Sequence, residues 1–241
     1  MRHYLSFGAG VNSVALYLLM VEQGYEFEAV FSDTGCEWPE TYHYLAMFQW
    51  WTKANGYPSI KILIPEVQGS RSLIEYCERY RMVPSFMHRW CTDKFKKRQL
   101  EKYQKPPAFI HIGFASDEAH RARLNSKAGY ESRFLLIEHG ITRAGCIDMI
   151  RKEGLPIPRK SGCYICPFQR VGTWQEMRRY YPDLFCRVST LEKEANISRV
   201  ERGKKPLYLS QSSKAPLSEI VGERQGVLFE QDEYPPCLCG L

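Results

Sequence analysis

Long hydrophobic runs are absent from this chain of 241 residues. No stretch approaches the roughly eighteen consecutive apolar residues that a membrane-spanning helix requires. The N-terminus also lacks the basic region and apolar core of a secretory signal, because one arginine is followed directly by strand-like residues. We therefore expect no membrane association and a cytoplasmic location.

Internal repeats and low-complexity segments are absent as well. The side chains that are present are sufficient for a core, since 44% of the residues are hydrophobic and 25% are charged. The length suits one large domain, or one domain with a small appendage. The formal net charge of +6 is compatible with a nucleic-acid partner, but solvated helix faces and phosphate ligands explain it equally well.

Nine cysteines are present, and cytoplasmic thiols stay reduced, so metal or redox roles are favoured over disulfides. Cys163 and Cys166 form a C-x-x-C pair before a proline, and Cys91 lies about seventy positions earlier. Three such thiolates can ligate an iron–sulfur cluster. The pair alone does not choose between a cluster, zinc and copper(I), and structural zinc or no metal remains open.

Strand-like and helical segments alternate over the first 150 residues. The expected strands are His3–Phe7, Glu28–Ser32, Lys61–Ile64, Ala108–Gly113 and Arg133–Ile137. The expected helices are Val14–Met20, Pro39–Asn55, Ser70–Arg81 and, later, Trp174–Leu191. This alternation predicts an α/β fold with a mostly parallel sheet and helices on both faces. We expect a nucleotide-binding domain at residues 1–150 and a helical or irregular, cysteine-bearing portion at residues 151–241.

A candidate phosphate-binding loop follows the first expected strand, from Ser6 to Ser13. Small residues at Gly8, Ala9 and Gly10 let backbone N–H groups approach an anion, and the next helix presents its positive N-terminus. The loop lacks the G-K-[ST] ending of a Walker A motif, and an ordinary tight turn is the alternative. Further polar loops follow other expected strands, where ligands bind in parallel sheets.

The loop resembles the S-G-G-x-D-S pyrophosphate loop of the adenine nucleotide alpha-hydrolase superfamily, the PP-loop ATP pyrophosphatases. Within that superfamily the chain resembles the phosphoadenylylsulfate (PAPS) reductase family. Three more segments resemble that family's motifs, in the family's order. They are Phe31 to Gly35 with Pro39-Glu40-Thr41 (D-T-G-x-x-x-P-E-T), Arg89 with Cys91 and Lys96 (R-x-C-x(4)-K), and Gly113 with Asp117, Glu118 and Arg121 (G-x-x-x-D-E-x-x-R).

The resemblance implies a site for ATP and Mg²⁺. The nucleotide-binding residues would be Ser6, Phe7, Gly8, Ala9, Gly10, Asn12, Ser13, Ser32, Asp33, Thr34, Gly35, Gly113 and Arg123. Asp117 and Glu118 would hold Mg²⁺, although capping of the following helix is equally compatible, and Arg121 would pair with phosphate oxygens. A simple turn is the alternative for Asp33-Thr34-Gly35.

The same resemblance implies that Cys91, Cys163 and Cys166 ligate an iron–sulfur cluster, which we expect to be 4Fe-4S. The C-terminal Cys239-Gly240-Leu241 resembles the E-C-G-[LI] segment of PAPS reductases, whose cysteine is the nucleophile, although Leu238 replaces the glutamate. The phosphate loop departs from the pyrophosphatase pattern at Ala9, Val11 and Asn12. Cleavage of ATP and mere binding of an adenylylated sulfate therefore both stay open.

Two enzymatic functions follow from the resemblance. The first is an ATP pyrophosphatase that adenylylates an acceptor for sulfur insertion, as in nucleic-acid thiolation or DNA phosphorothioation of the Dnd and Ssp type. Its sulfur donor would be a protein such as a cysteine desulfurase, and a homo-oligomer is compatible with it. The second is a sulfonucleotide reductase that forms sulfite from PAPS or adenylylsulfate with Cys239 as nucleophile. A non-catalytic nucleotide-sensing module with structural zinc is the third alternative.

Overall fold

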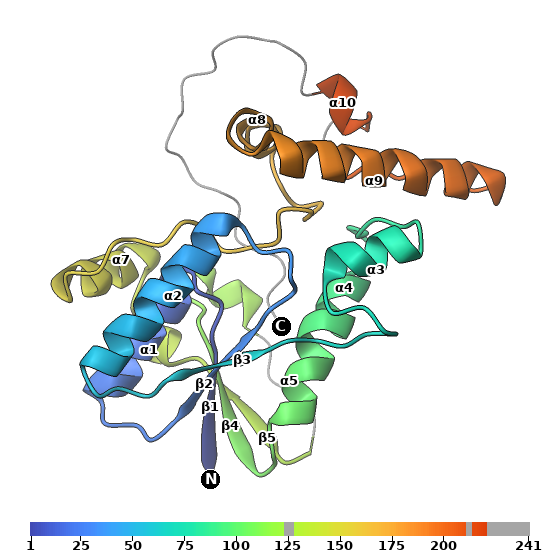
Figure 1. Ribbon diagram of the computed structural model, residues 1–241. Coiled ribbons are helices and arrows are strands. Elements are labelled where there is room, and N and C mark those ends of the chain that lie inside the picture. The colour runs from blue at the N-terminus through green and yellow to red at the C-terminus, as the bar shows by residue number, and fades with distance from the viewer. Residues whose placement is uncertain (123–127, 211–213, 221–241) are drawn as a thin grey trace.

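The computed structural model describes residues 1–122, 128–210 and 214–220 (Figure 1). In this part of the chain, strands form one sheet in the order β3-β2-β1-β4-β5, and all neighbouring strands are parallel. The strands are β1 (Arg2–Ser6), β2 (Glu28–Ser32), β3 (Ile60–Leu63), β4 (Ala108–Ile112) and β5 (Tyr130–Arg133). The predicted α/β class with a parallel sheet is confirmed.

The strand order reverses beside β1. The chain first adds β2 and β3 on one side of β1, and then places β4 and β5 on the other side. Tyr4 of β1 accordingly lies between Glu28 of β2 and Ile110 of β4. A crevice opens beyond the carboxyl ends of the strands at such a reversal, and ligands of parallel sheets bind there. The predicted phosphate loop follows β1 at this point.

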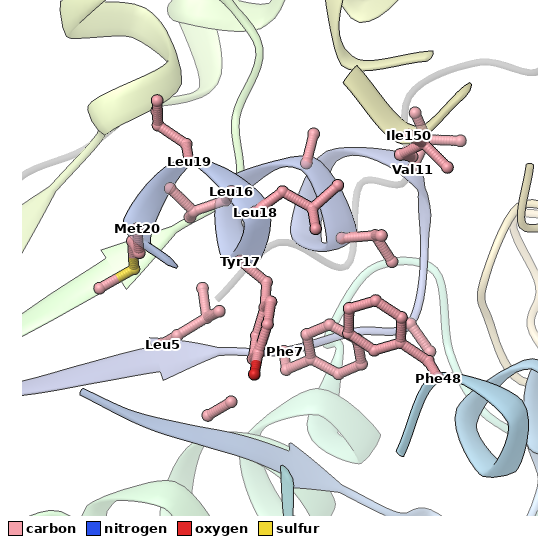
Figure 2. Close-up of a cluster of buried hydrophobic side chains, with 14 of the residues drawn as sticks. Leu5, Phe7, Val11, Leu16, Tyr17, Leu18, Leu19, Met20, Phe48 and Ile150 are labelled. Carbon is pink, nitrogen blue, oxygen red and sulfur yellow. The ribbon is translucent and has the colours of Figure 1, made fainter. Parts of the chain in front are cut away.

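Helices α1 (Val11–Glu22), α2 (Pro39–Ala54) and α7 (Arg143–Lys152) cover one face of the sheet (Figure 1). The main hydrophobic core lies beneath them (Figure 2), where Leu5 of β1 and Phe7, just after it, meet α1. Phe7 stacks on Phe48 of α2 with ring centroids 5.5 Å apart. α1 is buried on nearly all sides, because it lies between the sheet and α7.

The opposite face carries a smaller core. Successive side chains of a strand point to opposite faces, so Tyr4 and Val30 face away from Leu5 and Ala29. They pack against Leu100 of α5 (Arg98–Tyr103). Before α5 come the short α4 (Trp90–Thr92) and η1 (Asp93–Lys97), which is a π-helix. Helices therefore lie on both faces of the sheet.

A third core joins the C-terminal helices to the rest of the chain. Helices α8 (Val171–Tyr180) and α9 (Pro182–Glu201) lie beyond the end of the sheet opposite the N-terminus (Figure 1). With α10 (Leu217–Ile220) they bury Trp174 and its neighbours against α3 (Leu73–Arg79). Cys36, Trp38 and Phe95 belong to the same cluster. The proposed domain boundary near residue 150 stays a prediction.

Two predicted elements were wrong. The expected strand Arg133–Ile137 is the end of β5 followed by α6 (Leu135–Glu138). A short apolar run does not distinguish a strand from a buried helical turn, and Leu135 and Leu136 are fully buried in the main core. The expected helix Trp174–Leu191 is the two helices α8 and α9, because Pro182 starts a new helix.

The remaining element is η2 (Ser116–Arg121), a 3₁₀ segment after β4. No strand follows residue 150 within the described residues, as expected. None of the helices in this part of the chain combines the length and apolarity needed to cross a bilayer.

Candidate functional site

The loop between β1 and α1 has the geometry of an anion site. Ala9 adopts a left-handed backbone conformation with φ of 53°, and Gly10 is the N-cap of α1. The Gly10 N–H donates to Ser13 Oγ at 3.1 Å, while the Ser13 hydroxyl donates to the Gly10 carbonyl at 2.9 Å. The first N–H groups of a helix have no partner within it, so they face the crevice.

The structure restricts what Phe7 can contribute. Its ring is buried in the main core, and its N–H donates to the Val30 carbonyl at 2.9 Å. The role of Phe7 in nucleotide binding is therefore indirect, because Phe7 supports the phosphate loop by packing in the core. Ser13 lies in the first turn of α1, and its hydroxyl hydrogen-bonds with the backbone of Gly10 in the same loop.

The loop after β4 touches the phosphate loop. A Cβ on Gly113 would lie 3.0 Å from the backbone carbonyl of Asn12, so any other residue here would require the Asn12 backbone to shift by a few tenths of an ångström. The Asn12 side-chain amide donates to Glu118 Oε2 at 2.6 Å, and Arg121 pairs with Glu118 Oε1 at 2.5 Å. The structure thus brings Asn12, Gly113, Glu118 and Arg121 together, as the motif order predicted.

Asp117 has a different environment from Glu118. Both of its carboxylate oxygens accept the backbone N–H of Arg143, at 3.3 Å, where α7 begins. The Arg143 guanidinium donates in turn to Asn12 Oδ1 at 3.4 Å. This geometry matches the helix-capping alternative for Asp117. A Mg²⁺ site at Asp117 and Glu118 stays a prediction.

The loop after β2 is a tight turn. Asp33 Oδ1 accepts the Gly35 N–H at 2.8 Å and the Tyr42 hydroxyl at 2.7 Å. Ser32 donates its hydroxyl to the Phe95 carbonyl at 2.8 Å. Asp33 therefore holds the turn, which is the simpler alternative for Asp33-Thr34-Gly35, while Ser32 ties the end of β2 to η1. Contact of these residues with adenosine stays a prediction.

Cys91, Cys163 and Cys166 line a single pocket, as the sequence predicted. The pocket contains about 470 Å³ of space between protein atoms, open solvent included. Its other lining residues are Thr34, Leu73, Pro84, Arg89, Thr92, Lys96, Ile165, Pro167 and Phe168. We call this the thiol pocket. Burial raises the pKa of each of the three thiols, and that of Cys166 to about 11.

Backbone pairing holds the C-x-x-C segment in place. Glu37 and Cys163 form an antiparallel bridge, and the Tyr164 N–H donates to the Cys36 carbonyl at 2.7 Å. The Trp38 N–H reaches the Gly162 carbonyl at 3.4 Å on the other side. The cysteines are therefore fixed against the segment between β2 and α2.

A buried carboxylate organises the polar side of the thiol pocket. Glu37 Oε1 accepts the Thr34 hydroxyl at 2.9 Å, lies 3.4 Å from Lys96 Nζ, and lies 3.6 Å from Cys163 Sγ. Thr34 Oγ1 is 3.2 Å from the same sulfur. Burial acts to lower the pKa of Lys96, but the Glu37 carboxylate and the Cys163 thiol outweigh it, so that pKa is raised. Lys96 therefore carries its charge beside the thiols.

The donor set of the thiol pocket, three cysteine thiols, is of the kind that ligates an iron–sulfur cluster. No three or more His, Cys, Asp or Glu side chains among the described residues are grouped to hold one metal ion. Structural zinc needs its sulfurs converging at about 2.3 Å from one atom. The cysteines of a cluster bind different irons, so they surround a larger centre. Three thiols around one pocket with a fixed cation suit the cluster.

The phosphate loop lies against the segment that leads into the C-x-x-C pair. A Cβ on Gly10 would lie 2.7 Å from Ser161 Oγ, and Ser161 precedes Cys163 by two positions. Next to it, burial lowers the pKa of Lys160 to about 8; the Cys166 thiol opposes this shift, and Arg170, Arg143 and Arg121 add to it. We name these four side chains the cationic strip: Arg121, Arg143, Lys160 and Arg170.

Two predicted site residues lie outside the described residues. They are Arg123 and Cys239. Their assigned roles, with nucleotide and as nucleophile, stay predictions.

Comparison with known proteins settles the fold. No protein-family model matches the chain. An uncharacterized protein of Methanocaldococcus jannaschii is 22% identical over 198 residues, which cover 75% of this chain and 45% of that protein. The chain thus spans less than half of that relative. PAPS reductase from Candida auris superposes with a TM-score of 0.50 and 16% identity, over 66% of this chain and 75% of that one. The chain has a PAPS reductase-like fold.

The likeness to this solved structure confirms the PAPS reductase-like fold that the sequence motifs predicted. A second solved structure, the U34-tRNA thiolase NcsA from Methanococcus maripaludis with its [4Fe-4S] cluster, superposes with a TM-score of 0.39. It is 12% identical, over 81% of this chain and 72% of that one.

Within the PAPS reductase-like fold, three residues at the site were not identified from the sequence. Glu37 lies between a turn and a helix, where an isolated acid among apolar residues is the only signal. Lys160 and Ser161 precede the C-x-x-C pair in a segment without periodicity. Their roles depend on contacts with distant residues, which the sequence alone does not show.

Proposed function

We propose that this protein is an ATP pyrophosphatase that adenylylates an acceptor for sulfur insertion and holds an iron–sulfur cluster. The contact between Gly10 and Ser161 carries the proposal, because it joins the phosphate loop to the segment that bears Cys163 and Cys166. An acceptor activated at the crevice faces the thiol pocket without further rearrangement. A fold shared with PAPS reductase supports nucleotide binding at this place.

The nucleotide-binding roles fall on the phosphate loop and its neighbours. Backbone N–H groups around Gly8 and the N-terminus of α1 bind the phosphates. Glu118, positioned by Asn12 and Arg121, and Asp117 hold Mg²⁺. Arg121 and Arg143 neutralise the charge that develops when an acceptor oxygen attacks the α-phosphorus and pyrophosphate leaves.

The adenylylated oxygen is a good leaving group, and a sulfur nucleophile displaces it as AMP. Cys91, Cys163 and Cys166 would hold the cluster, which would supply a binding site for sulfide. Glu37 and Thr34 fix the position of Cys163, and Lys96 offsets the negative charge of the thiolates.

We place the acceptor among nucleic acids, as in thiolation or DNA phosphorothioation. The sulfur then comes from a donor such as a cysteine desulfurase, and a dithiol reductant converts its persulfide sulfur to sulfide. A cytoplasmic location keeps the thiols reduced.

A sulfonucleotide reductase is the second candidate. The solved PAPS reductase with the same fold favours it, and so does the C-terminal Cys239-Gly240-Leu241. In that reaction the Cys239 thiolate attacks the sulfate sulfur and the adenosine phosphate leaves. A dithiol reductant such as thioredoxin then releases sulfite.

The test uses anaerobically purified protein reconstituted with iron and sulfide. With ATP, Mg²⁺ and a mixture of tRNA and DNA, we expect pyrophosphate, and we expect a Glu118→Gln variant to lose most of the rate. Iron content should fall in Cys163→Ser and remain in Cys186→Ser, because Cys186 is exposed on α9. The same protein is then supplied with PAPS or adenylylsulfate and a dithiol.

Two outcomes would contradict the proposal. Sulfite release that disappears in Cys239→Ser would establish the reductase instead. Stoichiometric zinc without iron after anaerobic purification would remove the cluster.

A further inference from the structure

Aromatic side chains and an arginine surround the mouth of the thiol pocket. The rings of Phe86 and Phe168 lie with centroids 4.6 Å apart, and the Arg89 guanidinium carbon is 5.3 Å from the Phe168 ring centre. Arg89 and Phe168 line the pocket itself. Phe86 is 44% exposed and the adjacent Met87 is 82% exposed. Phe86 and Met87 therefore present apolar and aromatic surface to solvent beside Phe168, which lines the pocket with the thiols.

Local structure keeps this surface in place. A turn that begins at Ser85 positions it, because the Ser85 hydroxyl accepts the Met87 N–H and the Ser85 carbonyl accepts the Arg89 N–H. Arg89 adopts a left-handed conformation with φ of 42° and leads directly into α4, which carries Cys91. Phe168 follows Cys166 by two positions. Both sides of the mouth are thus tied by short chain segments to predicted cluster ligands.

The positive charge around the mouth of the thiol pocket indicates which kind of molecule binds there. Arg89 and Lys96 line the pocket. Within the cationic strip, Lys160 interacts electrostatically with Cys166 and Arg143, and Arg143 reaches Asn12 of the phosphate loop. An apolar protein partner would gain little from these cations. Nucleobases stack on aromatic rings and on guanidinium planes, and phosphates pair with cations. A nucleic acid is complementary to both features.

We propose that Phe86, Arg89 and Phe168 form a stacking site for one unpaired base of a single-stranded nucleic acid, whose phosphates lie along the cationic strip. This inference rests on the proposed function and specifies its acceptor. Bases within a duplex are already stacked on each other, so the site selects single strands, loops or extruded bases. The stacked base stands at the opening of the thiol pocket, where the sulfur is delivered.

Binding of the reconstituted protein to fluorescein-labelled single-stranded RNA and DNA oligonucleotides, without ATP, tests the inference. Stacking on aromatic side chains contributes about 1–3 kcal/mol per base, so Phe86→Ala and Phe168→Ala should each weaken binding roughly 5- to 150-fold. Trp50→Ala is the matched control, because Trp50 is 70% exposed on α2, and its binding should equal that of the wild type. An Arg170→Ala variant should lower the salt dependence by about one counterion.

Iron content of each variant shows whether the thiol pocket is intact, independently of any activity. Unchanged affinity in Phe86→Ala and Phe168→Ala with full iron content would overturn the inference, and so would equal affinity for a duplex of the same sequence. If Phe86→Ala and Phe168→Ala lose binding of PAPS or adenylylsulfate but keep oligonucleotide binding, the mouth of the pocket binds a sulfonucleotide and the inference is wrong. Failure of ATP cleavage with single-strand binding intact would reject the proposed function alone.

Discussion

His111 of β4 is a buried base whose neutral form is favoured by folding. Its Nε2 lies 2.9 Å from His3 Nδ1, and its Nδ1 has no hydrogen-bond partner among the described residues. Burial lowers the pKa of His111 to about 4, and the charges of His3 and Arg133 add to the shift. In the unfolded chain the pKa returns to about 6.5. The unfolded state therefore binds an extra proton between these two pH values.

The free energy of unfolding should consequently decrease as pH falls from about 6.5 to about 4. The stabilisation is complete above pH 6.5, and its loss amounts to about 3 kcal/mol for His111. Urea titrations between pH 7.5 and pH 4 measure it. The exposed His88→Gln variant should keep the wild-type pH profile, whereas His111→Leu should lose most of this slope. Identical profiles for the two variants would show that the slope comes from other groups.

At the scale of elements, Arg159 connects α2 to α8. Its guanidinium pairs with Glu40 of α2 and Glu176 of α8, both at 2.7 Å, and lies 4.5 Å from the Trp38 ring centre. Its side chain is 20% exposed. The Arg187 guanidinium of α9 pairs with Glu78 of α3 at 2.6 Å, but 45% of the Arg187 side chain is exposed. Screening by water should make the second pair weaker.

An Arg159→Met variant should lose about 2 kcal/mol of unfolding free energy, because it leaves two partly buried carboxylates without their cation. Arg187→Met should lose less than about 1 kcal/mol, as is usual for exposed pairs. Chemical denaturation of both variants at one pH measures the difference. Equal losses would mean that Arg159 does not hold α2 and α8 together.

Elements with apolar runs bounded by turn residues could be predicted from the sequence. β1, β2 and β4 are of this kind, and the phosphate loop and Asp33-Thr34-Gly35 directly follow the first two. β5 was misplaced because Tyr130–Arg133 is polar while the next three residues are apolar. The segment Trp90–Tyr103 gave no helical signal, since only Thr92, Phe95 and Leu100 are buried in it.

The three cysteines of the thiol pocket could be identified from the sequence, but the polar residues beside them could not. A C-x-x-C pair and a matching earlier cysteine stand out in one sequence. The Glu37–Cys163 contact joins positions that are 126 residues apart, and each residue alone is unremarkable. Such contacts arise from tertiary packing, which single-residue patterns do not encode.

At the scale of the whole molecule, one short segment connects the nucleotide crevice to the thiol pocket. Residues 159–166 begin with Arg159, which pairs with carboxylates of α2 and α8, and Lys160 of the cationic strip. Ser161, which lies next to Gly10, and the thiol-pocket residues Cys163 and Cys166 follow. Nucleotide binding at the phosphate loop should therefore restrict this segment. The Tyr164 and Cys166 amides are hydrogen-bonded in it, to Cys36 and Cys163 carbonyls respectively.

Hydrogen exchange followed by mass spectrometry should detect this restriction. With ATP and Mg²⁺, and separately with inorganic pyrophosphate, amides of residues 161–166 should exchange several-fold more slowly. Helix α9 is the internal control, because it packs away from the phosphate loop, and its exchange should not change. Protection confined to residues 8–13 would show that the two regions respond independently.

The π-helix η1 has a consequence for how the lysine and the first cysteine are arranged. Arg98 N–H bonds to the carbonyl of Asp93, five residues earlier, which marks one extra residue in the turn. In a regular α-helix, residues five apart, such as Cys91 and Lys96, point about 140° away from each other. With the wider turn between them, both residues line the thiol pocket. Deleting one residue from η1 would move the Lys96 ammonium group away from the thiols, although Lys96 itself would be unchanged. The number of residues in this turn therefore matters as much as the chemistry of their side chains.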